Sequence, residues 1–220
     1  DTIIEKNDTI TQDHIEALDA LAERVAQKEA ENPIKRLLQI ISSATIAAFL
    51  VFIFGYYLAT RERGIFDKPS QLLLLALLTV STAAIGSYLK TNEIDVFLVP
   101  TPLAAMLATI LLSPQTGLVL SFSLALFIGH IFGNFYVALI CALTASIAVY
   151  TVRHVRHRNQ FYRSMIFLPL SYTLLITSAD ILQFVPLESI YSHVLPGIFI
   201  GIAAPILVIG LLPIFESAFN

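Results

Sequence analysis

The sequence contains almost no sulfur chemistry. Its single cysteine, Cys141, lies in an apolar stretch, so a disulfide within the chain is excluded and a thiolate metal site is not expected. We interpret Cys141 as a small packing residue. No cofactor is predicted for this chain.

Charged residues are also scarce. Asp, Glu, Lys and Arg make up 13% of the 220 residues, whereas 56% are hydrophobic and the mean hydropathy is +0.78. These values lie outside the range of ordinary soluble domains and are typical of proteins that cross a membrane several times. The formal charge of −3 does not indicate a partner, because the acids concentrate in the first 31 residues and the bases in two later loops.

Several enzyme and transporter signatures are missing. The sequence has no His-Glu-x-x-His, no Gly-x-Ser-x-Gly and no pair of aspartates within an apolar stretch. It also shows no inverted internal repeat, which many transporters contain. We therefore predict no catalytic residue and no metal ligand, and we rank an intramembrane enzyme below a sensor or a transporter.

Seven apolar stretches are separated by polar breaks, and each is compared with the roughly 20 residues that a helix needs to cross a bilayer. The third and fourth stretches are short, so the break between them has a second interpretation, a re-entrant turn. The predicted fold is all-α, a polytopic membrane protein with seven transmembrane helices. The predicted spans are residues 38–60, 71–89, 96–112, 117–133, 135–152, 164–184 and 194–215.

A polar, acidic segment precedes the first span. Apolar residues recur there at helical spacing, from Ile15 through Leu18 and Ala22 to Val25, which predicts an amphipathic extracellular helix. We divide the chain into three parts. These are residues 1–37, the end of an extracellular domain with its linker; 38–216, the seven-helix transmembrane domain; and 217–220, the start of a second linker.

Basic residues predict the orientation of the spans. Arg61, Arg63 and Lys68 follow the first span, and residues 153–163 after the fifth carry four arginines. The opposite loops contain only Lys90. By the positive-inside rule the basic loops are cytoplasmic. We predict a multi-pass protein of the bacterial cytoplasmic membrane, with its N-terminus outside and its C-terminus in the cytoplasm.

Three stretches, "NDTITQDHIEALDALA", "VPTPLAAMLATILL" and "GLLPIFESAFN", carry a resemblance to a known family. They resemble the end of the extracellular domain, the third span and the cytoplasmic junction of bacterial seven-transmembrane receptors with an intracellular HD hydrolase domain, the PgpH-type cyclic-di-AMP phosphodiesterases. The resemblance implies a membrane sensor and anchor that relays an extracellular or membrane signal to the HD domain. In the family, that domain uses a divalent metal pair, Mn or Fe, to convert cyclic-di-AMP to pApA.

The HD domain is not expected within these 220 residues. An HD hydrolase needs a His-Asp dipeptide among its metal ligands, and Asp13-His14 has the reverse order. We therefore expect a segment of a longer protein that is not itself an enzyme and that meets cyclic-di-AMP only through the missing domain. Its expected partners are membrane lipids and its own extracellular and HD domains. Small residues at 142–148 predict a helix interface, within the chain or in a homodimer.

Polar residues near the predicted outer ends of the spans form a candidate site. Asp180 lies inside a span, where a charge needs a partner or a wet cavity. Two interpretations stay open: a vestibule for a small ligand, a cation or a proton, which would also suit a transporter or channel, or hydrogen bonds that only lock the helices together. The candidate residues are Thr101, His130, Asn134, Asp180, Glu188 and His193.

Two further groups lie toward the predicted cytoplasmic side. Prolines in the last span predict a kinked helix, which we expect to transmit a signal through Pro205, Pro213 and Glu216. The basic loop docks the HD domain, holds anionic lipid headgroups or only determines topology. Nucleic-acid binding is not expected, since no aromatic residues interleave the charges. The loop's arginines are Arg153, Arg156, Arg158 and Arg163.

Overall fold

The computed structural model describes residues 33–153 and 161–219, and every regular element in this part of the chain is a helix. This confirms the all-α prediction, although the predicted amphipathic helix before residue 33 lies outside the described residues. The chain divides between residues 48 and 49, within α2, and helices α3 to α9 all belong to the second unit, residues 49–220. The elements are α2 (Pro33–Arg61), α3 (Arg63–Phe66), α4 (Pro69–Thr91), the 3-10 helix η1 (Val96–Leu98), α5 (Thr101–Leu111), α6 (Pro114–Phe132), α7 (Phe135–Val152), α8 (Phe161–Leu182) and α9 (Leu187–Phe219).

Six of the described helices, α2, α4 and α6 to α9, are long and apolar enough to cross a membrane. Helix α7 has the bounds that the sequence predicts, and the other five contain most of their predicted spans. Their first residues explain where they begin. Proline occupies the start of α4 and α6, where its missing N–H costs no hydrogen bond, and the Ser113 hydroxyl accepts from the N–H of Thr116 at 3.1 Å.

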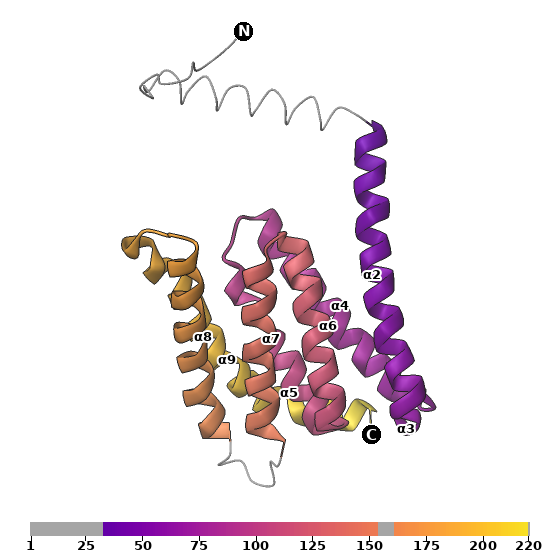
Figure 1. The fold of residues 1–220 in the computed structure, drawn as a ribbon. Helices are drawn as coiled ribbons and strands as arrows, with labels where there is room; N and C mark the ends of the chain where they lie inside the picture. Colours follow the sequence, from indigo (N-terminus) through magenta and orange to yellow (C-terminus); the bar gives the residue numbers. More distant parts are fainter. Residues whose placement is uncertain (1–32, 154–160, 220) are drawn as a thin grey trace, which may run out of the picture. The chain divides into compact units, whose positions relative to one another are not determined.

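The predicted third span differs from a single helix. Residues 96–112 consist of η1, the two non-helical residues Val99 and Pro100, the short helix α5 and the turn residue Leu112. Val99 is extended, with ψ of 124°, because a residue that precedes proline is disfavoured in the α region, and Pro100 itself has no N–H to donate. Phe97 packs near the C-terminal end of α8, whereas Leu111 lies beside the C-terminal end of α9. The segment therefore runs from one end of the bundle to the other (Figure 1), which favours a crossing over a re-entrant turn.

Helix α5 forms the centre of the bundle. Eight of its residues are buried, and it contacts α4, α6, α7 and α9. Ala105 of α5 packs against Ala145 and Val149 of α7, and Ala148 is also fully buried. The small-residue stripe at 142–148 therefore makes its helix interface within the chain.

Glycines let several helices approach closely. A Cβ atom on Gly201 of α9 would lie 2.8 Å from the backbone nitrogen of Pro169 in α8, and one on Gly129 of α6 would collide with the Cβ of Ala138 in α7. Small residues at such crossings are typical of helix packing in membranes. Lys90 adds a polar contact, since its ammonium donates to the carbonyl of Ile131 in the last turn of α6.

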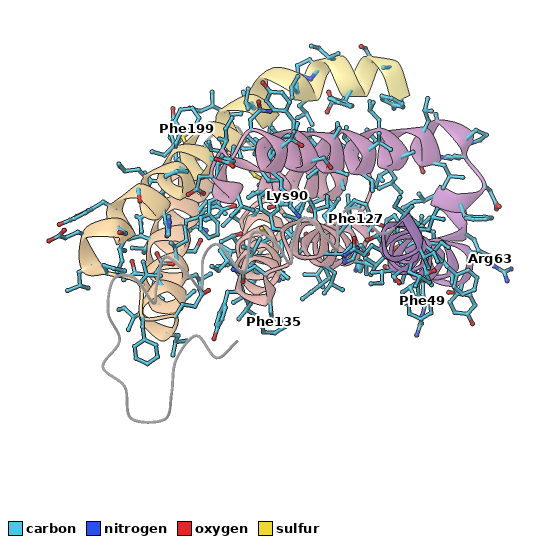
Figure 2. The ribbon with its side chains drawn as sticks, turned by 90° about the horizontal axis from the view of Figure 1, so that it is seen from above. Phe49, Arg63, Lys90, Phe127, Phe135 and Phe199 are labelled. Carbon is cyan, nitrogen blue, oxygen red and sulfur yellow. The ribbon has the colours of Figure 1, made fainter. Side chains whose placement is uncertain are left out.

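Large apolar side chains cover the outside of the bundle. Phe135 and Phe199 point away from it on different sides (Figure 2), with exposed fractions of 74% and 62%. An exposed apolar surface of this kind suits contact with lipid rather than water. The chain is therefore a multi-pass membrane protein.

Candidate functional site

Asp180 and His193 are joined by a side-chain contact. Among the described residues, no other carboxylate is paired with a basic side chain. The Nδ1 atom of His193 lies 3.0 Å from the Oδ2 atom of Asp180. Asp180 stands in the last turn of α8 and is 5% exposed, while His193 stands two turns into α9. A tight connection with Phe184 in the left-handed region, φ 57°, reverses the chain between them. A buried carboxylate requires such a partner, and His193 supplies it.

Asp95 joins this pair from the connection between α4 and η1. Its Oδ1 atom accepts a hydrogen bond from the N–H of Phe97 at 2.8 Å, which caps η1. Phe97 belongs to the same apolar cluster as Ala179, the neighbour of Asp180 in the chain, so Asp95 lies at the same end of the bundle as Asp180. We call Asp95, Asp180 and His193 the acid–histidine cluster.

Burial raises the pKa of the Asp95 carboxyl above its ordinary value. The N–H of Phe97 and the nearby His193 act against this rise, and the Asp180 carboxylate adds to it. Asp95 therefore interacts electrostatically with both Asp180 and His193. Two carboxyls and an imidazole at one end of the bundle can take up a proton or attract a cation.

The raised pKa predicts a pH-dependent effect of Asp95→Asn. The folded state binds a proton at Asp95 more readily than the unfolded state. The ionised carboxylate therefore lowers the stability of the fold as pH rises from the ordinary pKa of an aspartate to the raised pKa of Asp95 in the folded protein. The Asp95→Asn variant keeps the acceptor for the N–H of Phe97 but carries no charge at this position. We expect its unfolding temperature to exceed that of the wild type at pH 7, with the difference shrinking toward pH 4.

Thermal unfolding in detergent between pH 4 and 8 measures this difference. Asp95→Ala is the matched control, because it removes both the charge and the acceptor. A constant difference between wild type and Asp95→Asn at all pH values would contradict the prediction.

The other predicted vestibule residues do not join the cluster. Asn134 caps α7, accepting from the N–H of Tyr136 at 2.8 Å. His130 is half-buried in the last turn of α6, and Glu188 is exposed in the first turn of α9. No hydrogen bond or ion pair joins either of them to Asp180 or His193 within the described part of the chain. Only Asp180 and His193 of the six candidates meet.

Thr101 lies deeper, inside the bundle. Its hydroxyl is buried and, like that of Tyr172, has no hydrogen-bond partner of good geometry among the described residues. The Thr101 and Tyr172 hydroxyls both lie near the Cys141 thiol. The Tyr172 hydroxyl also lies near Thr144. This polar spot joins α5, α7 and α8 in the centre of the membrane block. Cys141 is free and buried, in agreement with a packing role.

Asp95 is the cluster residue that sequence reasoning missed. It belongs to the polar connection "TNEID" and stands directly before the predicted third span, so no apolar context marked it as unusual. Its position one residue before η1, at a site where a carboxylate caps the helix, is the signal that would have found it.

No group of three or more His, Cys, Asp or Glu side chains is placed to hold a metal ion within residues 33–153 and 161–219. The acid–histidine cluster therefore consists of one hydrogen-bonded carboxyl–imidazole pair, Asp180 and His193, and the further carboxyl of Asp95.

The predicted transmission residues lie along α9, which is helical from Leu187 to Phe219 despite its internal prolines. Pro205 is buried, whereas Pro213 and Glu216 are exposed. Glu216 lines a crevice of about 170 Å³ with Gln71 of α4 and the end of α5. Both figures show α9 curving along its length, as prolines in a helix interior lead us to expect.

The basic loop is described only at its two edges. Arg153 follows α7, and its guanidinium lies 3.9 Å from the centre of the Tyr150 ring. Arg163 stands in the first turn of α8. Arg156 and Arg158 lie outside the described residues.

One family model matches the chain. It is described as "7TM receptor with intracellular HD hydrolase", and it matches residues 37–220. No curated protein and no solved structure gives a match.

Proposed function

Because the chain belongs to the family of seven-transmembrane receptors with an intracellular HD hydrolase, we propose that it is the sensor and anchor of a cyclic-di-AMP phosphodiesterase. In this proposal the 220 residues contain no catalytic site. They relay an extracellular or membrane signal to an HD domain, which follows residue 220, binds a divalent metal pair and converts cyclic-di-AMP to pApA.

A single helix supports the relay. Helix α9 starts at the acid–histidine cluster and continues for 33 residues to Phe219, a length of about 50 Å at 1.5 Å per residue. A shift at His193 is therefore connected by one continuous helix to Glu216, where the HD domain would attach. We assign Pro205 the role of the flexible point, since a proline interrupts the backbone hydrogen bonds of the helix.

In this proposal the chain spans the inner membrane of a bacterium, and Glu216 lies on its cytoplasmic side. Arg61, Arg63, Arg153 and Arg163 stand at the ends of helices on the same side of the bundle as the C-terminal end of α9 (Figure 1). The positive-inside rule makes this side cytoplasmic. The acid–histidine cluster then faces outward, where an external ligand, cation or proton can reach it.

The full-length protein, extended through its HD domain, tests the proposal by cyclic-di-AMP hydrolysis. We expect metal-dependent release of pApA, and we expect deletion of the membrane block to change the rate about 5-fold or more, the usual lower range of coupling between distant sites. The HD domain with inactivated metal ligands is the control for contaminating activity.

A rate that deletion leaves unchanged would reduce the membrane block to an anchor. A folded, metal-loaded protein without hydrolysis would contradict the phosphodiesterase proposal. The break between η1 and α5 would then favour the transporter alternative, because transporters bind substrates at broken helices.

A further inference from the structure

A large groove lies between α7 and α8, next to the start of α6. It has a volume of about 1200 Å³. Its wall is mainly aliphatic and aromatic, with Leu118, Leu143, Ile147, Phe167 and Leu174 among its residues. The groove opens on the outside of the bundle, where the chain would meet lipid.

The hydroxyl groups in the wall do not make it polar. Ser146 donates to the carbonyl of Ala142 at 2.6 Å, and Ser171 donates to that of Leu168 at 2.8 Å. Each hydroxyl is therefore satisfied within its own helix and leaves little polarity facing the groove. Such a wall suits a hydrocarbon chain better than a water-soluble ligand.

Two arginines stand at one end of this apolar groove. Arg153 and Arg163 both line it, at the end where α7 finishes and α8 begins. Both side chains are exposed, and within the described residues neither forms an ion pair with a carboxylate. The Tyr150 ring, 3.9 Å from the Arg153 guanidinium, holds that cation at the mouth of the groove.

Charge and shape together indicate the occupant. Arginine binds phosphate through its fork of N–H donors and keeps its charge at any physiological pH. A phosphate beside an acyl chain is the chemistry of a phospholipid, and two arginine side chains at the end of the groove favour an anionic one. We propose that the α7–α8 groove is a binding site for an anionic phospholipid, with its phosphate between Arg153 and Arg163 and an acyl chain along Leu143, Ile147 and Leu174.

Native mass spectrometry of the purified chain in detergent tests this site, with dioleoylphosphatidylglycerol and dioleoylphosphatidylcholine as probes. We expect the wild type to bind the phosphatidylglycerol more tightly. The double variant Arg153→Gln/Arg163→Gln should bind phosphatidylglycerol roughly 10- to 30-fold more weakly than the wild type, as expected for the loss of two basic residues near an anionic headgroup. The matched control is Arg61→Gln/Arg63→Gln, which removes the same charge from the same side of the bundle but outside the groove.

Two further arms separate the possible sources of the effect. Ser171→Trp fills the groove and keeps both arginines, so it should also weaken phosphatidylglycerol binding. Glycerol phosphate, the headgroup without chains, should not compete at equal concentration. Equal losses in both double variants, or full competition by glycerol phosphate, would overturn the lipid site and leave only a general anion-attracting surface.

Discussion

Gly201→Ala is expected to destabilise the membrane block, although alanine is the better helix former. The new Cβ would lie 2.8 Å from the backbone nitrogen and 3.0 Å from the Cα of Pro169. Backbone atoms within a helix cannot rotate away, so α8 and α9 must separate. Overpacking of this kind costs about 1–3 kcal/mol, which exceeds the roughly 0.5–1 kcal/mol that alanine contributes in a helix interior.

Gly210→Ala in the same helix is the matched control. A Cβ on Gly210 meets nothing within 4 Å, so this variant should be neutral or slightly stabilising. Thermal unfolding of both variants in detergent measures the contrast. If Gly201→Ala were as stable as Gly210→Ala, the close α8–α9 contact would not exist in the detergent-solubilised protein.

His193→Ala is expected to cost more stability at neutral pH than Asp180→Ala. Removing the imidazole leaves the Asp180 carboxylate, 5% exposed, without its partner. An orphaned buried charge costs about 3 kcal/mol or more. Removing Asp180 instead leaves His193, whose side chain is 39% exposed and regains contact with water. The variant that loses more stability therefore identifies which side chain is buried enough to require its partner.

A double variant sharpens the test. His193→Ala/Asp180→Asn removes the orphaned charge, so it should recover part of the stability that His193→Ala loses. Glu188→Gln, exposed in the first turn of α9, should be near neutral. Unfolding temperatures at pH 7 give all four values. Equal losses for His193→Ala and Asp180→Ala would show that Asp180 is hydrated rather than buried.

The sequence predicted the long helices well, because length and hydrophobicity are enough to identify a membrane span. It did not predict the break at Val99 and Pro100, although both residues carry the signal. The apolar run continues across them, and hydrophobicity outweighed the local backbone restriction that a proline imposes. Average hydrophobicity does not record where a helix is interrupted.

The site was predicted less completely, for a physical reason. Asp180 stood out because a charge within an apolar run is costly, and His193 was placed at its level by counting along the spans. Asp95 was missed because its environment depends on η1 packing against α9, a contact between distant parts of the chain. His130, Asn134 and Glu188 share a level in the membrane with the cluster, but depth alone does not determine which side chains face each other.

Because α5 is enclosed by other helices, it and the outer helices respond differently to a change in bilayer thickness. The long outer helices touch lipid, so they tilt when the thickness of the hydrocarbon layer changes. Helix α5 is buried on nearly every side by α4, α6, α7 and α9. Membrane thinning or thickening therefore reaches α5 only through the side chains of its neighbours, and the outer helices rearrange around a centre that hydrophobic mismatch does not act on directly.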